Sequence, residues 1–250
     1  MEAPLFIYML RLADTALVLG HRLSEWSGRG PTLEEDIALS NLGLDLIGQA
    51  RMLFDYAGKI EGKDRDEDAL AYWRDDRDYR NLLLVEQPNG DFATTMMRQL
   101  LYAAFAHPFH QALARSKDET LAGIGAKAEK EMAYHVRHAA EWVIRLGDGT
   151  GESHARTQAA LDELVDYTAE MFEVDAIEHA LIKVGIAPDP AKLHAAFDAT
   201  LEHVLREATL RMPMHGRTQS GGRNGVHSEH LSRMLAEMQS LHRAHPGAVW

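Results

Sequence analysis

The sequence has no cysteine among its 250 residues. Disulfides, thiolate metal sites and cysteine nucleophiles are therefore excluded, and a reducing compartment is compatible with that absence. Long apolar runs are also missing, since none approaches the roughly 18 residues that a membrane-spanning helix needs. The apolar run from Leu5 to Leu10 is cut short by Arg11 and Asp14, and it has neither a basic leader nor a small-residue cleavage site. We therefore expect a cytoplasmic protein without a signal peptide or a membrane span.

Basic residues are fewer than acidic ones, at 26 Lys and Arg against 38 Asp and Glu, which gives a net charge of −12. A chain this acidic is repelled by phosphate backbones and by anionic lipid surfaces. We therefore expect neither nucleic acid nor a membrane as its main partner. Apolar residues make up 46% of the chain and charged residues 26%, a composition typical of globular soluble domains.

Helical periodicity dominates the chain, and no strand-like alternation is sustained. Four long helices are predicted at about 4–26, 32–58, 92–115 and 117–146. Further helices are predicted at about 153–172, in a segment ending near 185, after Pro188, and at about 228–244. Long helices joined by modest loops are typical of a four-helix bundle. We therefore predict an all-α single domain over 1–250, with a core bundle at about 4–146 and a C-terminal helical extension at about 153–250.

Local signals support several of these helix boundaries. Thr32-Leu-Glu-Glu35 has the form of a capping box, and Asp91 is a good N-cap for the third long helix. Gly147 is placed for a left-handed C-terminal cap. Pro108 is expected to bend or end the third helix.

One spacing that this class of bundle needs is missing. Bundles that hold paired iron or manganese ions use a Glu on each of two helices and a Glu-x-x-His pair on each of the other two. None of the 14 histidines follows an Asp or Glu by three residues, and the segment from Phe92 to Arg115 contains no Asp or Glu. The third helix therefore has no carboxylate to give to such a centre.

The fourth helix still carries polar residues near its apolar stripe. His135 lies within the stripe, and Glu131 and His138 lie at its edge when the segment is wound as a helix. Because His135 comes four residues after Glu131, we interpret them as a hydrogen-bonded pair rather than a chelate. A satisfied structural histidine is favoured over a metal ligand.

The second helix has a polar row of Asn41, Asp45 and Gln49 at intervals of four residues. We interpret this row as facing solvent or a partner helix, since Gly48, three residues after Asp45, cannot ligate a metal through a side chain. Asp45, Glu131, His135 and His138 are thus the candidates for a vestigial metal site. We predict no catalytic, cofactor-binding or metal-binding residue in this chain.

Other groups of residues give weaker indications of a metal-binding, phosphate-binding or catalytic site. His227 and His230 flank Glu229 at the start of a predicted helix, where polar residues are usually caps rather than metal ligands. Phosphate-binding glycine loops and the G-x-S-x-G nucleophile turn are missing. Arg217 and Arg223 are the two arginines that could meet a phosphate.

Several sequence blocks resemble a known family. They are Asn41-Leu-Gly-Leu-Asp-Leu-Ile-Gly-Gln-Ala-Arg51, Asn81-Leu-Leu-Leu-Val-Glu-Gln-Pro-Asn-Gly-Asp-Phe92, Gly221-Gly-Arg-Asn-Gly-Val-His227, Glu229-His-Leu, Met234-Leu-Ala-Glu-Met-Gln239 and Pro246-Gly-Ala-Val-Trp250. Together they resemble the PaaC subunits of ring-1,2-phenylacetyl-CoA epoxidase, a multicomponent bacterial monooxygenase. The resemblance runs from about Leu10 to Trp250 and covers nearly the whole chain.

That resemblance implies a ferritin-like fold that has lost its di-iron centre. It implies as partners an iron-bearing catalytic subunit PaaA, a small subunit PaaB, and a reductase PaaE that carries FAD and an iron–sulfur cluster. The implied complex uses O₂ and NADPH to form the 1,2-epoxide of phenylacetyl-CoA in phenylacetate breakdown. The implied role of this chain is non-catalytic support of PaaA, with no cofactor of its own.

Two other functions stay open at the level of the sequence. One is a free-standing di-iron or di-manganese oxidase or oxygenase with an unusual ligand set drawn from Asp45, Glu131, His135 and His138. The other is a helical adaptor unrelated to oxygenases. A homodimer in the absence of a partner also stays open.

Overall fold

A computed structural model describes residues 3–213 and 218–248, and all regular structure within them is helical. The α-helices of this described part are α1 Pro4–Ser24, α2 Leu33–Glu61, α3 Glu67–Tyr72, α4 Leu83–Glu86, α5 Phe92–Leu113, α6 Glu119–Gly147, α7 Gly151–Leu164, α8 Ala176–Val184, α9 His194–Glu207, α10 Glu229–Met238 and α11 Ser240–Ala244. Short 3₁₀ turns lie at Asp76–Asp78, Val165–Tyr167, Ala169–Phe172, Pro190–Leu193 and Gly222–Asn224.

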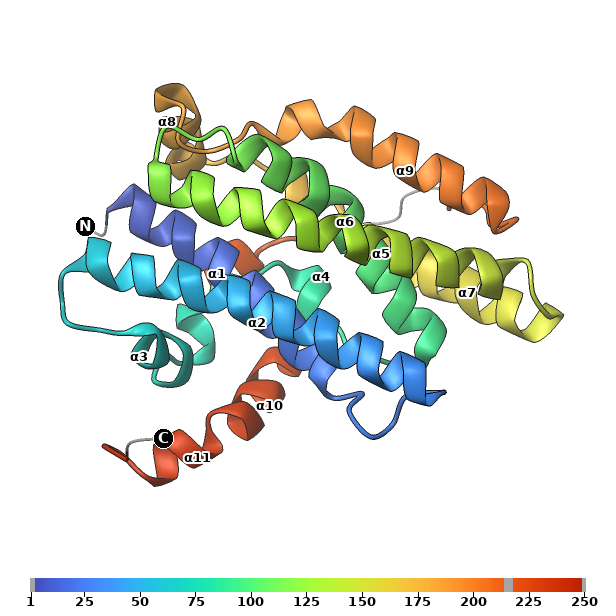
Figure 1. Cartoon of the computed structure of the whole chain (residues 1–250), viewed down its shortest axis with the longest axis horizontal. Coiled ribbons are helices and arrows are strands. Elements are labelled where there is room, and N and C mark those ends of the chain that lie inside the picture. Colours follow the sequence, from blue (N-terminus) through green and yellow to red (C-terminus); the bar gives the residue numbers. More distant parts are fainter. Residues whose placement is uncertain (1–2, 214–217, 249–250) are drawn as a thin grey trace.

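Two antiparallel helical hairpins form the bundle. α1 packs along α2, α5 packs along α6, and α2 and α6 close the hairpins against each other. Figure 1 shows the four long helices crossing the molecule side by side. The predicted all-α, ferritin-like bundle with extra C-terminal helices is confirmed.

Helix α5 is buried on nearly every side, because it contacts α6, α7 and α9. A helix in this position must be apolar around its whole circumference, which explains why it carries no carboxylate. Two of its polar side chains, Arg98 and Gln99, are fully buried as well. The helix continues through Pro108 to Leu113, close to its predicted end near 115, so of the two expectations for this proline, a bend or an end, the end is wrong.

The N-terminal caps follow the sequence signals closely. The side chain of Asp91 accepts a hydrogen bond from the backbone N–H of Thr94, and the hydroxyl of Thr32 accepts one from Glu35. The carboxylate of Glu35 does not complete a capping box, because it is hydrogen-bonded to His138 of α6. A side chain at a helix start is thus used for contact between helices.

Gly147 does not have the left-handed conformation that was predicted for it. It is the last residue of α6, and the following C-cap is Asp148. A Cβ at this position would meet the backbone carbonyl oxygen of Ala208 at the end of α9. Glycine is therefore needed here for close packing of α9 on α6, and a sequence cannot distinguish this from a cap.

The C-terminal extension differs from its predicted boundaries at several points. In place of one helix at 153–172, the α-helix ends at Leu164 and two short 3₁₀ turns follow it. The proline that begins the next helical segment is Pro190, not Pro188. The last predicted helix is divided into α10 and α11 at Gln239, whose amide nitrogen donates to the carbonyl oxygens of Ala71 and Arg74.

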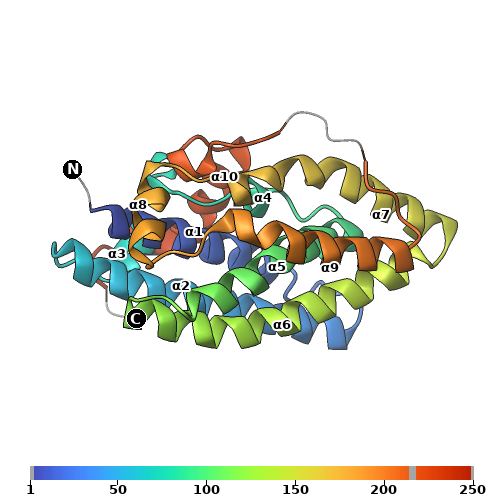
Figure 2. The same cartoon turned by 90° about the horizontal axis from the view of Figure 1, so that it is seen from above.

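The extension wraps two sides of the bundle. α7 and α9 lie along α5 and α6, while α8 packs on α1. Figure 2 shows α9 running along α5 and α6, with α10 on the far side of α1. None of the described helices combines the length and the apolarity required to cross a lipid bilayer.

Candidate functional site

A chain of hydrogen bonds crosses the centre of the bundle through His135 of α6. The amide nitrogen of Gln99 on α5 lies 2.9 Å from Nδ1 of His135, and the carboxylate of Asp45 on α2 lies 3.3 Å from Nε2. His135 is fully buried. Burial lowers the pKa of His135 below its usual value, and the hydrogen bond to Asp45 only partly opposes this. The ring is therefore neutral, accepts at Nδ1 from Gln99, and donates from Nε2 to Asp45.

Glu131 lies one turn from His135 and has its own partners. Its carboxylate accepts from the amide nitrogen of Gln49 at 2.8 Å and lies 3.4 Å from the ammonium nitrogen of Lys127. The predicted hydrogen bond between Glu131 and His135 does not form. Instead, Glu131 pairs with Gln49 of α2 and with Lys127 of its own helix. His135 pairs with Gln99 of α5 and Asp45 of α2.

The polar row of α2 divides between two environments. Gln49 is buried and Asp45 half-buried, and both face α6, while Asn41 is exposed. The structure thus brings together Asp45, Glu131 and His135. His138 lies apart from them, with its Nε2 2.9 Å from the Glu35 carboxylate.

These donors do not fit a di-metal centre. Such a centre in a four-helix bundle needs a carboxylate from each helix and two imidazoles with free lone pairs. Here α5 offers the amide of Gln99, and both ring nitrogens of His135 are engaged by protein groups. No group of three or more His, Asp or Glu side chains able to hold a metal ion exists within residues 3–213 and 218–248.

A cavity of about 60 Å³ lies inside the bundle beside this cluster. Gln49 belongs to both, because it lines the cavity and donates to Glu131. The other walls come from α1, α5, α8 and the segments at Leu82, Met171, Pro190 and Arg223. The cavity is therefore bounded by both hairpins and by the C-terminal extension.

The C-terminal blocks fold back onto the loop before α5. Glu86 is fully buried and accepts hydrogen bonds from the backbone N–H of Ser228 at 2.7 Å and from the side chain of Asn81 at 3.1 Å. His227 lies 2.9 Å from the same carboxylate. A Cβ at Gly222 would meet the carbonyl oxygen of Asn81, so this close approach requires a glycine. The blocks 81–92 and 221–227 are thus in direct contact.

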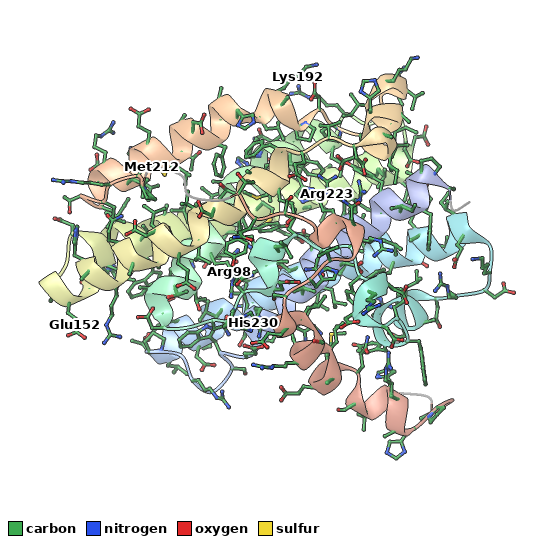
Figure 3. The ribbon with its side chains drawn as sticks, turned by 180° about the vertical axis from the view of Figure 1, so that it is seen from behind. Arg98, Glu152, Lys192, Met212, Arg223 and His230 are labelled. Carbon is green, nitrogen blue, oxygen red and sulfur yellow. The ribbon has the colours of Figure 1, made fainter. Side chains whose placement is uncertain are left out.

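The histidines and arginines singled out near the C-terminus have structural partners. The cap of α10 is Ser228, whereas His227 binds the Glu86 carboxylate and the carbonyl oxygen of Tyr79, so His227 has a structural partner but is not itself the cap. Arg223 is buried and pairs with Glu178 of α8, so it does not meet a phosphate at the surface. Figure 3 shows Arg223 within the fold, whereas Lys192 and Glu152 lie at its outer edge. Arg217 lies outside the described residues.

One face of the bundle carries apolar side chains that are exposed in the described part of the chain. Leu33, Ile37 and Leu44 fall on one side of α2 by their spacing and are 73%, 53% and 64% exposed. Tyr134 is exposed on the adjacent helix α6. We call these four residues the α2 stripe. Exposed apolar groups arranged in this way are typical of a protein–protein contact.

Three residues that bind the candidates His135, Glu131 and His138 were not identified from the sequence. Gln99, Lys127 and Glu35 were not candidates, although each binds one of the predicted residues. For Gln99 a signal exists, because a glutamine inside an otherwise apolar helix needs a buried polar partner. Lys127 and Glu35 have the spacing of ordinary surface residues.

Two comparisons cover the whole chain. The sequence profile of the family described as phenylacetic acid catabolic protein matches residues 1–250. The chain is also 49% identical, over 243 residues, to one of the subunits of 1,2-phenylacetyl-CoA epoxidase from Escherichia coli (strain K12). That alignment covers 97% of this chain and 98% of the relative, so the similarity includes both the bundle and the C-terminal extension.

Proposed function

The chain belongs to the phenylacetic acid catabolic protein family, and from that premise we propose that it is a non-catalytic structural subunit of a phenylacetyl-CoA epoxidase. The resemblance seen in the sequence blocks is confirmed by these comparisons. A relative that is 49% identical over almost its full length and is itself a subunit of such an enzyme supports membership in the complex. This role places the chain in the cytoplasm.

The non-catalytic part of the proposal rests on His135. Its two ring nitrogens are occupied by Gln99 and Asp45, in the part of the bundle where a di-iron protein has its ligands. Oxygen chemistry then belongs to an iron-bearing sister subunit, PaaA. A small subunit PaaB and a reductase PaaE with FAD, an iron–sulfur cluster and NADPH complete the system.

The α2 stripe is the surface that we assign to the sister subunit. A catalytic bundle must hold its ligands to within about half an ångström. A second bundle packed along it buries apolar surface and restrains its helices without binding metal. The stripe supplies such a surface on a long, regular helix.

We expect the purified full chain to retain well below one iron atom per chain after reconstitution with excess ferrous iron. The physical reason is that the amides of Gln49 and Gln99 stand where anionic ligands are needed. Iron analysis measures this directly, with the catalytic subunit reconstituted in parallel as the positive control. Retention close to two irons per chain would refute the non-catalytic assignment, and Glu131 and His135 would then be the first residues to replace.

The double substitution Ile37→Asp with Leu44→Asp is expected to reduce co-purification with the catalytic subunit at least about tenfold, because an unpaired carboxylate would be buried in an apolar contact. Pull-down from co-expressed subunits measures the effect. The matched control is Val184→Asp on α8, which also places a carboxylate at an exposed apolar site, 50% exposed. Equal co-purification of both variants, with unchanged thermal stability, would show that the sister subunit binds elsewhere. Loss of a homodimer in the double variant alone would assign the stripe to self-association.

A further inference from the structure

The cavity beside Gln49 has a polar end formed by Arg11 and Glu178. Both side chains are more than nine-tenths buried. Nε and Nη1 of Arg11 and Oε2 of Glu178 have no hydrogen-bond partner among residues 3–213 and 218–248. Buried polar atoms are nearly always hydrogen-bonded, to protein, water or ligand, so this end of the cavity is built to receive a polar group.

The charges at the polar end are balanced. The guanidinium of Arg11 pairs with Asp175 and lies 3.9 Å from the carboxylate of Glu178, which also pairs with Arg223. This ion-paired network contains two cations and two anions, so it has no net charge for a ligand to neutralise. A ligand anion would face Glu178, and a ligand cation would face the two guanidiniums, so a charged ligand gains nothing that offsets its desolvation.

The remaining walls are apolar or neutral. Leu53, Phe105, Phe109 and Met171 line the cavity with hydrocarbon, aromatic and thioether surface. His110 also lines it, and burial lowers the pKa of this histidine to about 4, so the ring carries no charge at neutral pH. The walls therefore accept a short apolar body.

We propose that the cavity binds a small neutral molecule whose head group both donates and accepts hydrogen bonds, such as a primary amide or an alcohol. The head group accepts from Arg11 and donates to Glu178, and its short apolar body lies among Leu53, Phe105 and Met171. An engineered apolar cavity of about 150 Å³ takes benzene. A cavity of about 60 Å³ therefore has room for a ligand body smaller than benzene. This site is independent of the proposed contact with a sister subunit, which lies on the outer face of α2.

A series of four probes with nearly equal size tests the head group. Acetamide is neutral and both donates and accepts, acetate is an anion, acetamidinium is a cation, and acetone only accepts. Each is titrated into the full-length chain at up to tens of millimolar, since ligands of four heavy atoms bind weakly. The readout is the NMR signal of the Met171 methyl group, assigned with a Met171→Leu variant.

We expect a saturable shift with acetamide and at least a tenfold weaker response with acetate and acetamidinium. Acetone, which cannot donate to Glu178, is expected to respond more weakly than acetamide. Equal responses to all four probes, or none to any, would overturn the proposal and leave the cavity as a hydrated space only.

A variant that fills the cavity gives a second measurement. Ala106 is buried and lines the cavity, so Ala106→Leu is expected to abolish the acetamide response. Ala112→Leu on the same helix, away from the cavity, is the matched control. A folded Ala106→Leu variant that still binds acetamide would contradict the site. Should that variant not fold, the probe series on the unmodified chain decides the question by itself.

Discussion

Replacing Asp14 by alanine is expected to lower the free energy of unfolding by about 3–5 kcal/mol. Asp14 is fully buried on α1 and accepts hydrogen bonds from both terminal nitrogens of Arg74 and from the backbone N–H of Arg80. Arg74 is also buried and has no other carboxylate within salt-bridge distance among the described residues. Removing Asp14 therefore leaves a guanidinium in the interior without its counterion.

Urea unfolding followed by circular dichroism measures this change. The control is Arg51→Ala, which breaks an exposed ion pair with Glu67 and is expected to cost less than about 1 kcal/mol. The double replacement of Asp14 by Leu and Arg74 by Met should recover part of the loss, because it removes both charges together. A single Asp14→Ala variant as stable as the Arg51→Ala control would show that the buried pair contributes nothing to the fold.

The pair also shows what a sequence can and cannot predict. The four long helices were predictable because their apolar residues recur with the helical period, and Thr32 and Asp91 mark their starts through local hydrogen bonds. The partner of Asp14 was not predictable, since Arg74 lies 60 residues away and follows the short helix α3. Local chemistry determines where a helix begins, but only the packed fold determines which charges meet.

For the polar residues around His135, the sequence predicted which residues are candidates but not which side chains they bind. His135 and Glu131 were identifiable because they lie within and at the edge of the apolar stripe of one predicted helix, and Asp45 because it belongs to the polar row of another. The roles of these residues depend on Gln49 and Gln99, which complete their hydrogen bonds from α2 and α5. The ion pair of Glu131 with Lys127 follows the i,i+4 spacing of one helix. Its hydrogen bond to Gln49 and the bonds of His135 to Gln99 and Asp45 come from facing helices, and spacing within α6 carries no information about them.

Replacing Glu86 by alanine is the second change for which we expect a large loss, again about 3–5 kcal/mol. The fully buried carboxylate joins two distant segments, since Asn81 of its own segment and the adjacent residues His227 and Ser228 all donate to it. Without this carboxylate, the N-cap residue of α10, Ser228, loses its hydrogen bond to the end of α4. Hydrogen exchange should show faster exchange in α10 than in α6, whereas the exposed variant Glu229→Ala should leave α10 protected. Uniform protection of α10 in Glu86→Ala would contradict this role.

Measuring stability against pH shows how much the charge of Glu86, as distinct from the shape of its side chain, contributes to the contact with His227. Burial lowers the pKa of His227, but the hydrogen bonds to the carboxylate of Glu86 and the carbonyl of Tyr79 outweigh it and raise the pKa above its usual value. A histidine whose pKa is raised on folding stabilises the fold fully below the unfolded pKa of about 6.5, and this contribution is lost as the pH rises through the folded pKa. The free energy of unfolding should therefore fall above about pH 6.5 in the unmodified chain. Glu86→Gln keeps the shape of the side chain and removes its charge, so this fall should be smaller in the variant, and an identical fall in both would exclude His227 as its source.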